Sequence, residues 1–230
     1  MSSNGRRLPA RRGKGAIPAR RGGTVAPTRV GPVERRFGDA LVQVDRVYRV
    51  PSVQPTESGP WTHEADKIAW VDPATGLACI IRRAAYGGHL CGYVGVEPGH
   101  SLFGFRHDAF PHVFDIRVHG GLDYSEACER GPEETTVCHV TADDMVHDES
   151  DPRWWFGFSC DQPYDVVPGI RTTPDATMAA EPVYRDEAFV FEQCGMLAAQ
   201  LQAIAEGRPL DLSGTPGPLP IGLDPDRAGS

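Results

Sequence analysis

The sequence lacks any run of about 18 apolar residues, the shortest stretch that crosses a membrane as a helix, so we expect no transmembrane helix and no membrane partner. The arginine-containing amino-terminal stretch lacks an apolar core and matches neither common bacterial export signal. No Cys-x-x-Cys pair occurs among the six cysteines, which are Cys79, Cys91, Cys128, Cys138, Cys160 and Cys194. These absences predict reduced thiols rather than a disulfide framework, and a cytoplasmic location.

The motifs of the commonest enzyme classes are also missing, including the P-loop, the dinucleotide-binding Gly-x-Gly-x-x-Gly, the Gly-x-Ser-x-Gly elbow and the kinase signatures. Eight histidines occur without the spacing of His-x-His or His-Glu-x-x-His metal sites. We therefore assign no metal ligand and no cofactor. A metal site assembled from His89, His119 and Asp161 stays an alternative.

Charge is distributed unevenly along the chain. Residues 1–36 contain ten Lys or Arg and one acid, whereas the remainder contains 13 basic and 30 acidic residues. The basic stretch is rich in Gly and Pro, so it cannot bury enough apolar surface to offset its ordering entropy. We predict a mostly disordered basic extension over residues 1–57, a single domain over 58–206 and a Gly/Pro-rich tail over 207–230.

Apolar patterning in the predicted domain favours strands followed by one helix. Residues 67–71 and 78–82 flank Asp-Pro-Ala-Thr-Gly, which predicts a β-hairpin, and the Gly-containing run 90–96 predicts a strand with a bulge or a close backbone contact. An apolar stripe predicts a helix over residues 187–206, capped by Asp186. The stripe consists of Val190, Cys194, Leu197, Leu201 and Ile204. The predicted fold class is α+β, a mainly antiparallel sheet with one long carboxy-terminal helix packed on it.

Alternation of apolar and polar residues predicts further strands. The clearest is 113–119, where Phe114, Ile116 and Val118 share one face. Residues 135–140 and 153–160 are further strand candidates, and residues 38–50 could form an outlying strand.

Two motifs follow the ends of these strands. In the first, His119 can act as a base, an acid or a metal ligand, Asp123 could orient it, and the pair Gly120-Gly121 would expose backbone amides to a ligand. The alternative is a tight glycine turn in which the histidine satisfies backbone groups. Neither interpretation is excluded by the residues alone.

The second motif runs from Trp154 to Asp161. Alternation places Trp155 on the face opposite Trp154, where it could offer a flat platform for a ring. Cys160 is a candidate nucleophile, but the adjacent Asp161 would raise the pKa of its thiol, so a buried, inert cysteine is the favoured interpretation.

Several motifs together resemble a widespread group of phage, prophage and bacterial proteins with HGGLxYS and GFxC patterns. The matching segments are 61–63, 88–96, 118–125, 154–161 and 184–186. The group's second motif reads Gly-Phe-Asp-Cys-Ala-His with an acid three residues later. Here Cys160 and Asp165 match it, whereas Ser159 and Gln162 replace the first acid and the histidine. The resemblance implies a phage-type accessory protein; if the group is enzymatic, it implies an impaired member or one that uses Asp161.

We therefore expect the two motifs to form one concave site for a small, polar, ring-bearing ligand such as a nucleotide. Hydrolysis would use His119 as base, Asp123 or Asp115 to orient it, and Tyr124 and Arg82 to stabilise charge. The candidate catalytic residues are His119, Asp123, Tyr124, Cys160 and Asp161, and the candidate ligand-binding residues are Gly120, Gly121, Trp155, Arg82 and Asp165.

Two other classes of function stay open. One is a non-catalytic factor that binds a host protein or sequesters a ligand. The other, weaker alternative is nucleic-acid contact, which is expected only through residues 1–36 because the remaining chain is acidic and repels phosphate.

Overall fold

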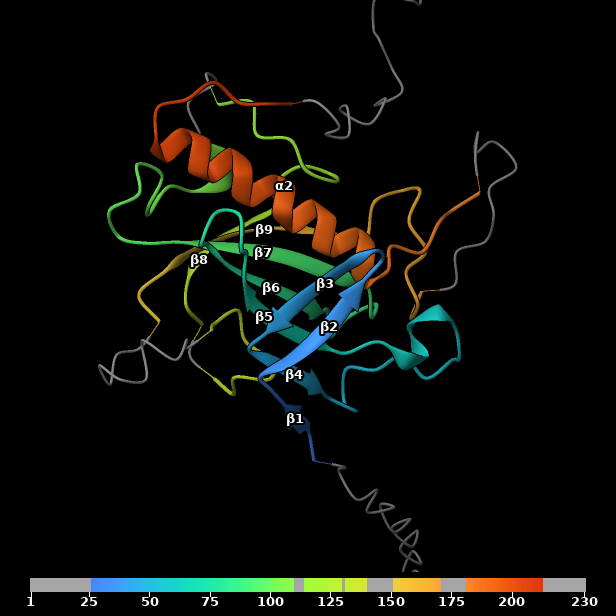
Figure 1. The fold of residues 1–230 in the computed structure, drawn as a ribbon. Coiled ribbons are helices and arrows are strands. Elements are labelled where there is room, and N and C mark those ends of the chain that lie inside the picture. Colours follow the sequence, from blue (N-terminus) through green and yellow to red (C-terminus); the bar gives the residue numbers. More distant parts are fainter. Residues whose placement is uncertain (1–25, 110–113, 130, 140–150, 171–180, 213–230) are drawn as a thin grey trace, which may run out of the picture.

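The protein is an antiparallel sheet with one long helix packed on it (Figure 1). A computed structural model describes residues 26–109, 114–129, 131–139, 151–170 and 181–212. Seven strands form one sheet in the order β1-β4-β5-β6-β7-β9-β8, and β2 pairs with β3. The strands are β1 (Thr28–Val30), β2 (Val33–Phe37), β3 (Ala40–Val44), β4 (Arg46–Arg49), β5 (Lys67–Val71), β6 (Ala78–Arg83), β7 (Leu90–Val96), β8 (Tyr124–Ala127) and β9 (Trp154–Ser159); helix α2 spans Glu187–Ala205, and short 3-10 helices span Pro60–His63 and His107–Ala109. The predicted α+β class is confirmed.

Helix α2 and the β2–β3 hairpin pack on the same face of the large sheet (Figure 1). The predicted stripe on α2 is buried against this face, and Phe37 of β2 stacks on Phe191 of α2 with 4.4 Å between ring centroids. The predicted cap is confirmed, because the Asp186 side chain accepts a hydrogen bond from the Phe189 backbone N–H. Gly207, at a φ of +66°, ends the helix in the left-handed conformation that favours glycine.

The close approach of α2 to β7 depends on a glycine. A Cβ atom at Gly92 would lie 2.4 Å from Cζ of Phe158 and 2.8 Å from Sγ of Cys194 on the helix. Any larger residue would therefore displace packed side chains. The predicted close backbone contact in 90–96 is confirmed at this position.

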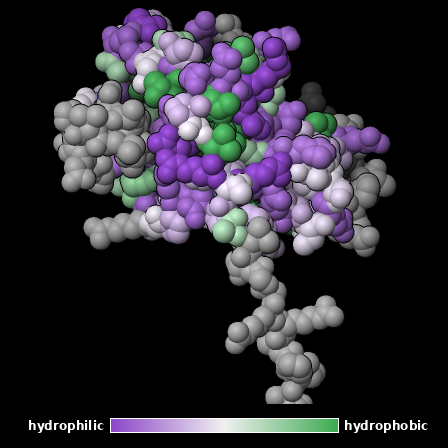
Figure 2. All heavy atoms as spheres, turned by 60° about the horizontal axis from the view of Figure 1, so that its bottom comes forward, coloured by the Kyte–Doolittle hydropathy of each residue, from purple (hydrophilic) through white to green (hydrophobic). Residues whose placement is uncertain are grey.

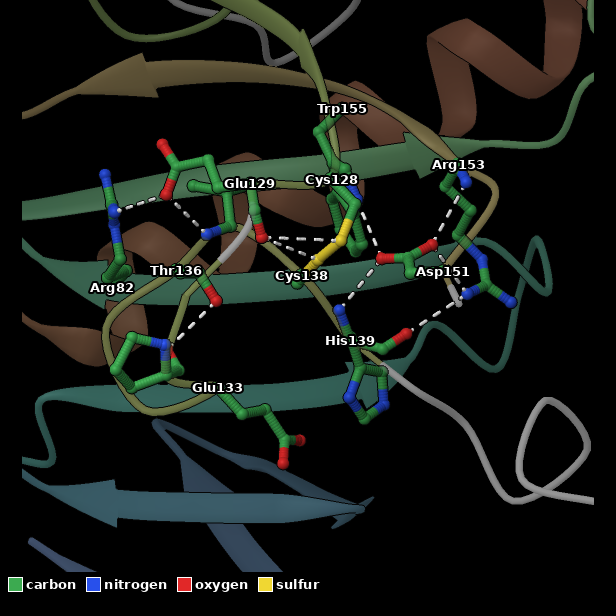
Figure 3. Close-up of a disulfide and its surroundings, with 12 residues drawn as sticks. Arg82, Cys128, Glu129, Glu133, Thr136, Cys138, His139, Asp151, Arg153 and Trp155 are labelled. Carbon is green, nitrogen blue, oxygen red and sulfur yellow. Dashed lines mark hydrogen bonds and ion pairs between the residues drawn. A yellow bond between two sulfur atoms is a disulfide. The ribbon is translucent and has the colours of Figure 1, made fainter. Parts of the chain in front are cut away.

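The opposite face of the sheet carries a smaller apolar cluster, which consists of Ala69, Ala78, Ile80, Cys91, Tyr93, Val137 and Trp155. Val137 belongs to residues 131–139, which we call the covering segment because it runs across this face (Figure 3). The sheet thus separates two layers of packing with different partners.

The strand pairs predicted from local patterns are present. β5 and β6 form the hairpin, and Asp72 organises its turn by accepting hydrogen bonds from the backbone and hydroxyl of Thr75. β7 pairs with both β6 and β9. No helix in the described ranges is long and apolar enough to cross a membrane.

The strand predicted over 113–119 is wrong in its described part. Residues 114–118 are extended but pair with no strand. Two glutamines of α2 take the place of a neighbouring strand: Gln200 accepts from the Arg117 N–H and donates to its carbonyl, and Gln193 accepts from the His119 N–H. The alternation is real because Phe114, Ile116 and Val118 pack on the core, but the backbone partner is a helix.

Two other expectations are corrected. Residues 135–139 form turns and irregular structure rather than a strand, and Val140 lies outside the described residues. The ordered fold also begins before the expected boundary at residue 58, because β1 and β4 belong to the large sheet and β2–β3 buries Phe37 and Val44. β1, β2 and β4 each contain arginine, and the basic composition of residues 1–36 suggested an extension.

Candidate functional site

His119 and Asp165 are brought together, as the two-motif hypothesis requires. The His119 ring is buried and its Nε2 lies 2.6 Å from Oδ2 of Asp165. The Phe189 ring of α2 packs edge-on against the imidazole, with 5.1 Å between centroids. The histidine is thus held by packing and by a carboxylate at once.

Asp165 joins three segments of the chain. Its carboxylate accepts hydrogen bonds from the Gln162 N–H, from His119 and from Arg185, the last at 2.8 Å. Burial alone would raise the pKa of Asp165, but the hydrogen bonds from His119 and Arg185 outweigh this effect and lower it. The hydrogen bonds of Asp165 thus connect Arg185, which lies just before α2, with both motifs.

Gly120 and Gly121 form the tight turn between His119 and β8, with φ values of +70° and +85°. A Cβ atom at Gly120 would lie 2.4 Å from the side-chain amide of Gln162. The second motif therefore packs directly against the first, and the glycines serve this contact.

A second polar group lies beside this turn, with Asp123, Asp161 and His89 as its titratable members. Although Asp123 is exposed as a residue, partial burial of its carboxyl group beside Ser159 raises its pKa, and the charge of Asp161 adds to the effect. Nε2 of His89 lies 3.8 Å from Asp161, and burial lowers the pKa of His89. The acid that orients His119 is Asp165; Asp115 instead pairs with the exposed Arg117.

Two residues proposed for chemistry are sealed in the core. Cys160 is 2 % exposed, and burial raises the pKa of its thiol far above the ordinary value, so no thiolate nucleophile is available at this position. Trp155 is fully buried, and its Nε1–H donates to Asp151 at 3.0 Å, so its ring offers no free stacking face. Cys160 is thus the buried, inert cysteine that the sequence favoured, packed in the core on the helix side. The expected stacking role of Trp155 is corrected, because its ring packs in the cluster with Val137 of the covering segment.

Arg82 and Tyr124 meet on the sheet face opposite α2. The guanidinium of Arg82 donates to the Tyr93 hydroxyl at 3.0 Å and to the Thr135 carbonyl at 2.8 Å, and it lies 3.4 Å from Glu129. Tyr124 packs edge-on against Tyr93, and burial raises the pKa of its hydroxyl. These residues lie on the other side of the sheet from His119, so the predicted set divides into two places.

A cavity of about 150 Å³ opens beside Arg82, where β6 ends. It is lined by Val53, Asp66, Arg82, Arg83, Ala85, Glu134 and Thr135. The Nε atom of Arg82 is buried and has no hydrogen-bond partner among the described residues. A guanidinium with one unused donor at a small cavity is suited to an oxyanion such as a carboxylate.

Arg83 and Asp66 form the rigid wall of this cavity. Arg83 donates to Asp66 at 2.8 Å, to Glu64 at 3.0 Å and to the Gly88 carbonyl at 2.8 Å, and Tyr184 donates to Glu64. Sequence reasoning missed this network. The signal was present in the alternation of β6, because two consecutive arginines in a strand must point to opposite faces.

The covering segment is tied down at several points (Figure 3). A disulfide joins Cys128 to Cys138, with 4.9 Å between Cα atoms. The buried ammonium group of Lys67 donates to the carbonyls of Glu133 and Cys138. The expectation of six reduced thiols is therefore corrected for this pair, whose separation of ten residues is not a Cys-x-x-Cys spacing. The other four cysteines are free and buried.

One group of potential metal-ligand atoms occurs in the described residues: the two disulfide sulfurs and Asp151. The sulfurs are bonded to each other. Asp151 accepts from the backbone N–H groups of His139 and Arg153, from the Arg153 guanidinium and from Trp155 (Figure 3). With these donors in place, the group is an anchor for the chain rather than a coordination site.

Comparisons with protein-family models, with curated proteins and with solved structures give no match to this chain. We therefore base the functional proposal on the geometry.

Proposed function

We propose that the protein binds a small polar molecule carrying a carboxylate or similar oxyanion, in the cavity beside Arg82, without transforming it. The observation that carries this proposal is the buried, unused Nε donor of Arg82 at a lined cavity. A buried donor without a partner is costly, and a bound acceptor would satisfy it.

The size of the cavity limits the ligand. A volume of about 150 Å³ lies below the range of about 300 Å³ and more that is typical of drug-sized ligands. A molecule the size of an amino acid or a small hydroxy acid fits this limit better than a whole nucleotide.

The walls suggest the second chemical group of the ligand. Arg83 and Asp66 neutralise each other, whereas Glu134 has no hydrogen bond or ion pair in the described part of the chain. A ligand with an amino or hydroxyl group opposite its carboxylate would pair with Glu134 while the carboxylate meets Arg82. Amino acids have this arrangement.

Binding without a reaction is proposed because the reactive groups considered from the sequence lie away from the cavity. His119 is committed to Asp165 on the other side of the sheet, and Cys160 is buried there as an uncharged thiol. His119 and Cys160, the base and the nucleophile considered from the sequence, are thus separated by the sheet from the cavity. Binding alone matches the non-catalytic, ligand-sequestering alternative.

Calorimetric titration with a panel of amino acids, hydroxy acids, inorganic phosphate and mononucleotides tests the proposal. We expect saturable binding of a small acid that weakens at least tenfold in Arg82→Gln and in Ala85→Leu, which fills the cavity without removing a polar contact. The control is Arg106→Gln, because Arg106 is exposed and pairs with the exposed Asp108 away from the cavity lining. Binding that survives both cavity variants, or no binding of any panel member, contradicts the proposal.

The face shown in Figure 2 gives less support to a protein partner than the cavity gives to a small ligand. This face is mostly hydrophilic, and its hydrophobic groups lie at several places in the upper part of the view, separated by hydrophilic ones. Exposed apolar residues such as Val30 on β1 and Leu41 on β3 are the kind that most soluble surfaces carry singly.

A further inference from the structure

The covering segment forms one wall of the Arg82 cavity. Glu134 and Thr135 line the cavity, and the Thr135 carbonyl accepts from Arg82. The neighbouring Glu133 carbonyl accepts from the buried Lys67. The position of this wall therefore decides whether the cavity has its described shape.

The disulfide closes the loop that carries this wall. Cys128 precedes the covering segment and Cys138 lies near its end, ten residues later. Glu129 bridges the two arms, since its carboxylate accepts from the Val137 N–H and pairs with Arg82 (Figure 3). Two thiol sulfurs cannot remain at bonding distance, so reduction moves them apart and removes the covalent link between the two arms.

One end of this bond is accessible to an attacking thiolate, and the free thiols of the chain are not. Cys128 is only half-buried, whereas Cys79, Cys91, Cys160 and Cys194 are all buried. Burial also raises the pKa of each of these four thiols. The four buried thiols therefore do not react with the disulfide or with a thiol reagent, and exchange is restricted to Cys128 and Cys138.

We infer that Cys128–Cys138 is a thiol–disulfide exchange site that controls ligand binding in the Arg82 cavity, an inference that rests on the proposed function. A small thiol such as glutathione attacks Sγ of Cys128 as its thiolate, the Sγ–Sγ bond breaks, and Cys138 leaves as a thiolate that takes up a proton. A second glutathione attacks the mixed disulfide, releases the Cys128 thiol and yields glutathione disulfide. The protein thus gains two electrons and two protons, and the two glutathiones are oxidised.

The test compares the oxidised full-length chain with the same chain treated with dithiothreitol under native conditions. Alkylation and mass spectrometry should label Cys128 and Cys138 alone. Hydrogen exchange should rise at residues 131–138 but not in β7. The affinity for the small acid found with the panel should fall at least tenfold. The double variant Cys128→Ser/Cys138→Ser should match the reduced protein and ignore dithiothreitol, and the reduced wild type provides the same comparison if this variant does not fold.

The outcomes separate the two proposals. Equal affinity of the oxidised and reduced proteins for the small acid overturns the exchange switch and leaves the binding function intact. No Arg82-dependent binding in either state overturns the binding function and the control of it together. Labelling of the four buried cysteines at the same rate overturns the selectivity on which the switch depends.

Discussion

Asp165 holds three segments with one carboxylate, so its charge should contribute measurably to stability. Replacing it by Asn keeps the size of the side chain but leaves His119 and Arg185 without a common anion. We expect the free energy of unfolding, measured with urea at neutral pH, to fall by about 3 kcal/mol. The control Asp115→Asn removes an exposed pair with Arg117 and should cost less than about 1 kcal/mol. Equal losses of unfolding free energy in the two variants would show that the buried cluster stabilises the protein no more than an exposed ion pair.

The lowered pKa of Asp165 also predicts that the stability of the protein depends on pH in acid. Folding lowers the pKa of Asp165 below its ordinary value of 3.8. The unfolded chain therefore takes up this proton first, and the stabilisation present above pH 4 is lost as the pH falls through the folded pKa. The unfolding free energies of wild type and Asp165→Asn should converge as the pH falls below the ordinary pKa of 3.8. A difference that stays constant over this range speaks against a charge effect.

Lys67 predicts a second window, at alkaline pH, in which stability rises with pH. Burial lowers its pKa from 10.5 to about 8, so between these values the unfolded chain holds a proton that the folded protein has lost. Stability attributable to Lys67 therefore rises with pH across this window, by roughly 3 kcal/mol at about 1.4 kcal/mol per pKa unit. Lys67→Met should remove this rise. Parallel pH profiles of the two proteins from chemical denaturation would contradict the burial of a charged amine.

Sequence patterns could predict the meeting of His119 with the residues after β9, because both motifs follow apolar runs that end in glycine and polar residues. They could not identify Asp165 as the partner of His119, since that contact depends on how residues 161–165 turn back. Alternation did place Trp155 opposite Trp154, but the burial of its ring depends on the covering segment, which is distant in sequence.

At the scale of elements, the glutamines of α2 replace a strand. Gln200 makes two hydrogen bonds to the backbone of Arg117, so Gln200→Leu should leave a buried N–H and carbonyl unpaired. We expect a loss of about 1–3 kcal/mol and faster hydrogen exchange at residues 114–118, measured by mass spectrometry.

The matched control is Gln202→Leu, because the half-buried Gln202 side chain donates to the exposed Glu206 on the same helix and has no bond to residues 114–119. It should leave exchange at 114–118 unchanged. Similar exchange in both variants would mean that packing of Phe114 and Ile116, rather than the glutamines, holds the segment.

The use of glutamine side chains in place of a neighbouring strand also explains which elements the sequence pattern could predict. β5, β6, β7, β9 and α2 have apolar periodicities that agree with their partners. The extended segment 114–118 has the periodicity of a strand as well, but a one-dimensional pattern does not state whether a strand or a glutamine pair satisfies its backbone.

At the scale of the whole molecule, the amino-terminal boundary has a testable position. A chain beginning at residue 51 loses β4 and the β2–β3 hairpin and exposes the buried Trp70 and Ile68. We expect it to unfold or aggregate at room temperature, whereas a chain beginning at residue 26 should show the circular dichroism and melting temperature of the full protein. Equal stability of both shortened chains would contradict the placement of β1–β4 in the fold.

The same boundary refines the test for nucleic-acid contact. Three of the basic residues counted in the first 36, Arg29, Arg35 and Arg36, lie in strands β1 and β2. Arg35 also pairs with Glu187 of α2. Salt-dependent DNA binding is therefore best compared between the full chain and the chain beginning at residue 26, because a deletion through residue 36 would change the fold as well as the charge.

The sheet keeps the His119 cluster and the Arg82 cavity in separate compartments. Substitutions of His119 and of Arg82 act on opposite sides of the sheet, so their energetic effects should nearly add. Natural variation, or directed evolution, could then retune what the cavity accepts while the helix-side scaffold is inherited unchanged.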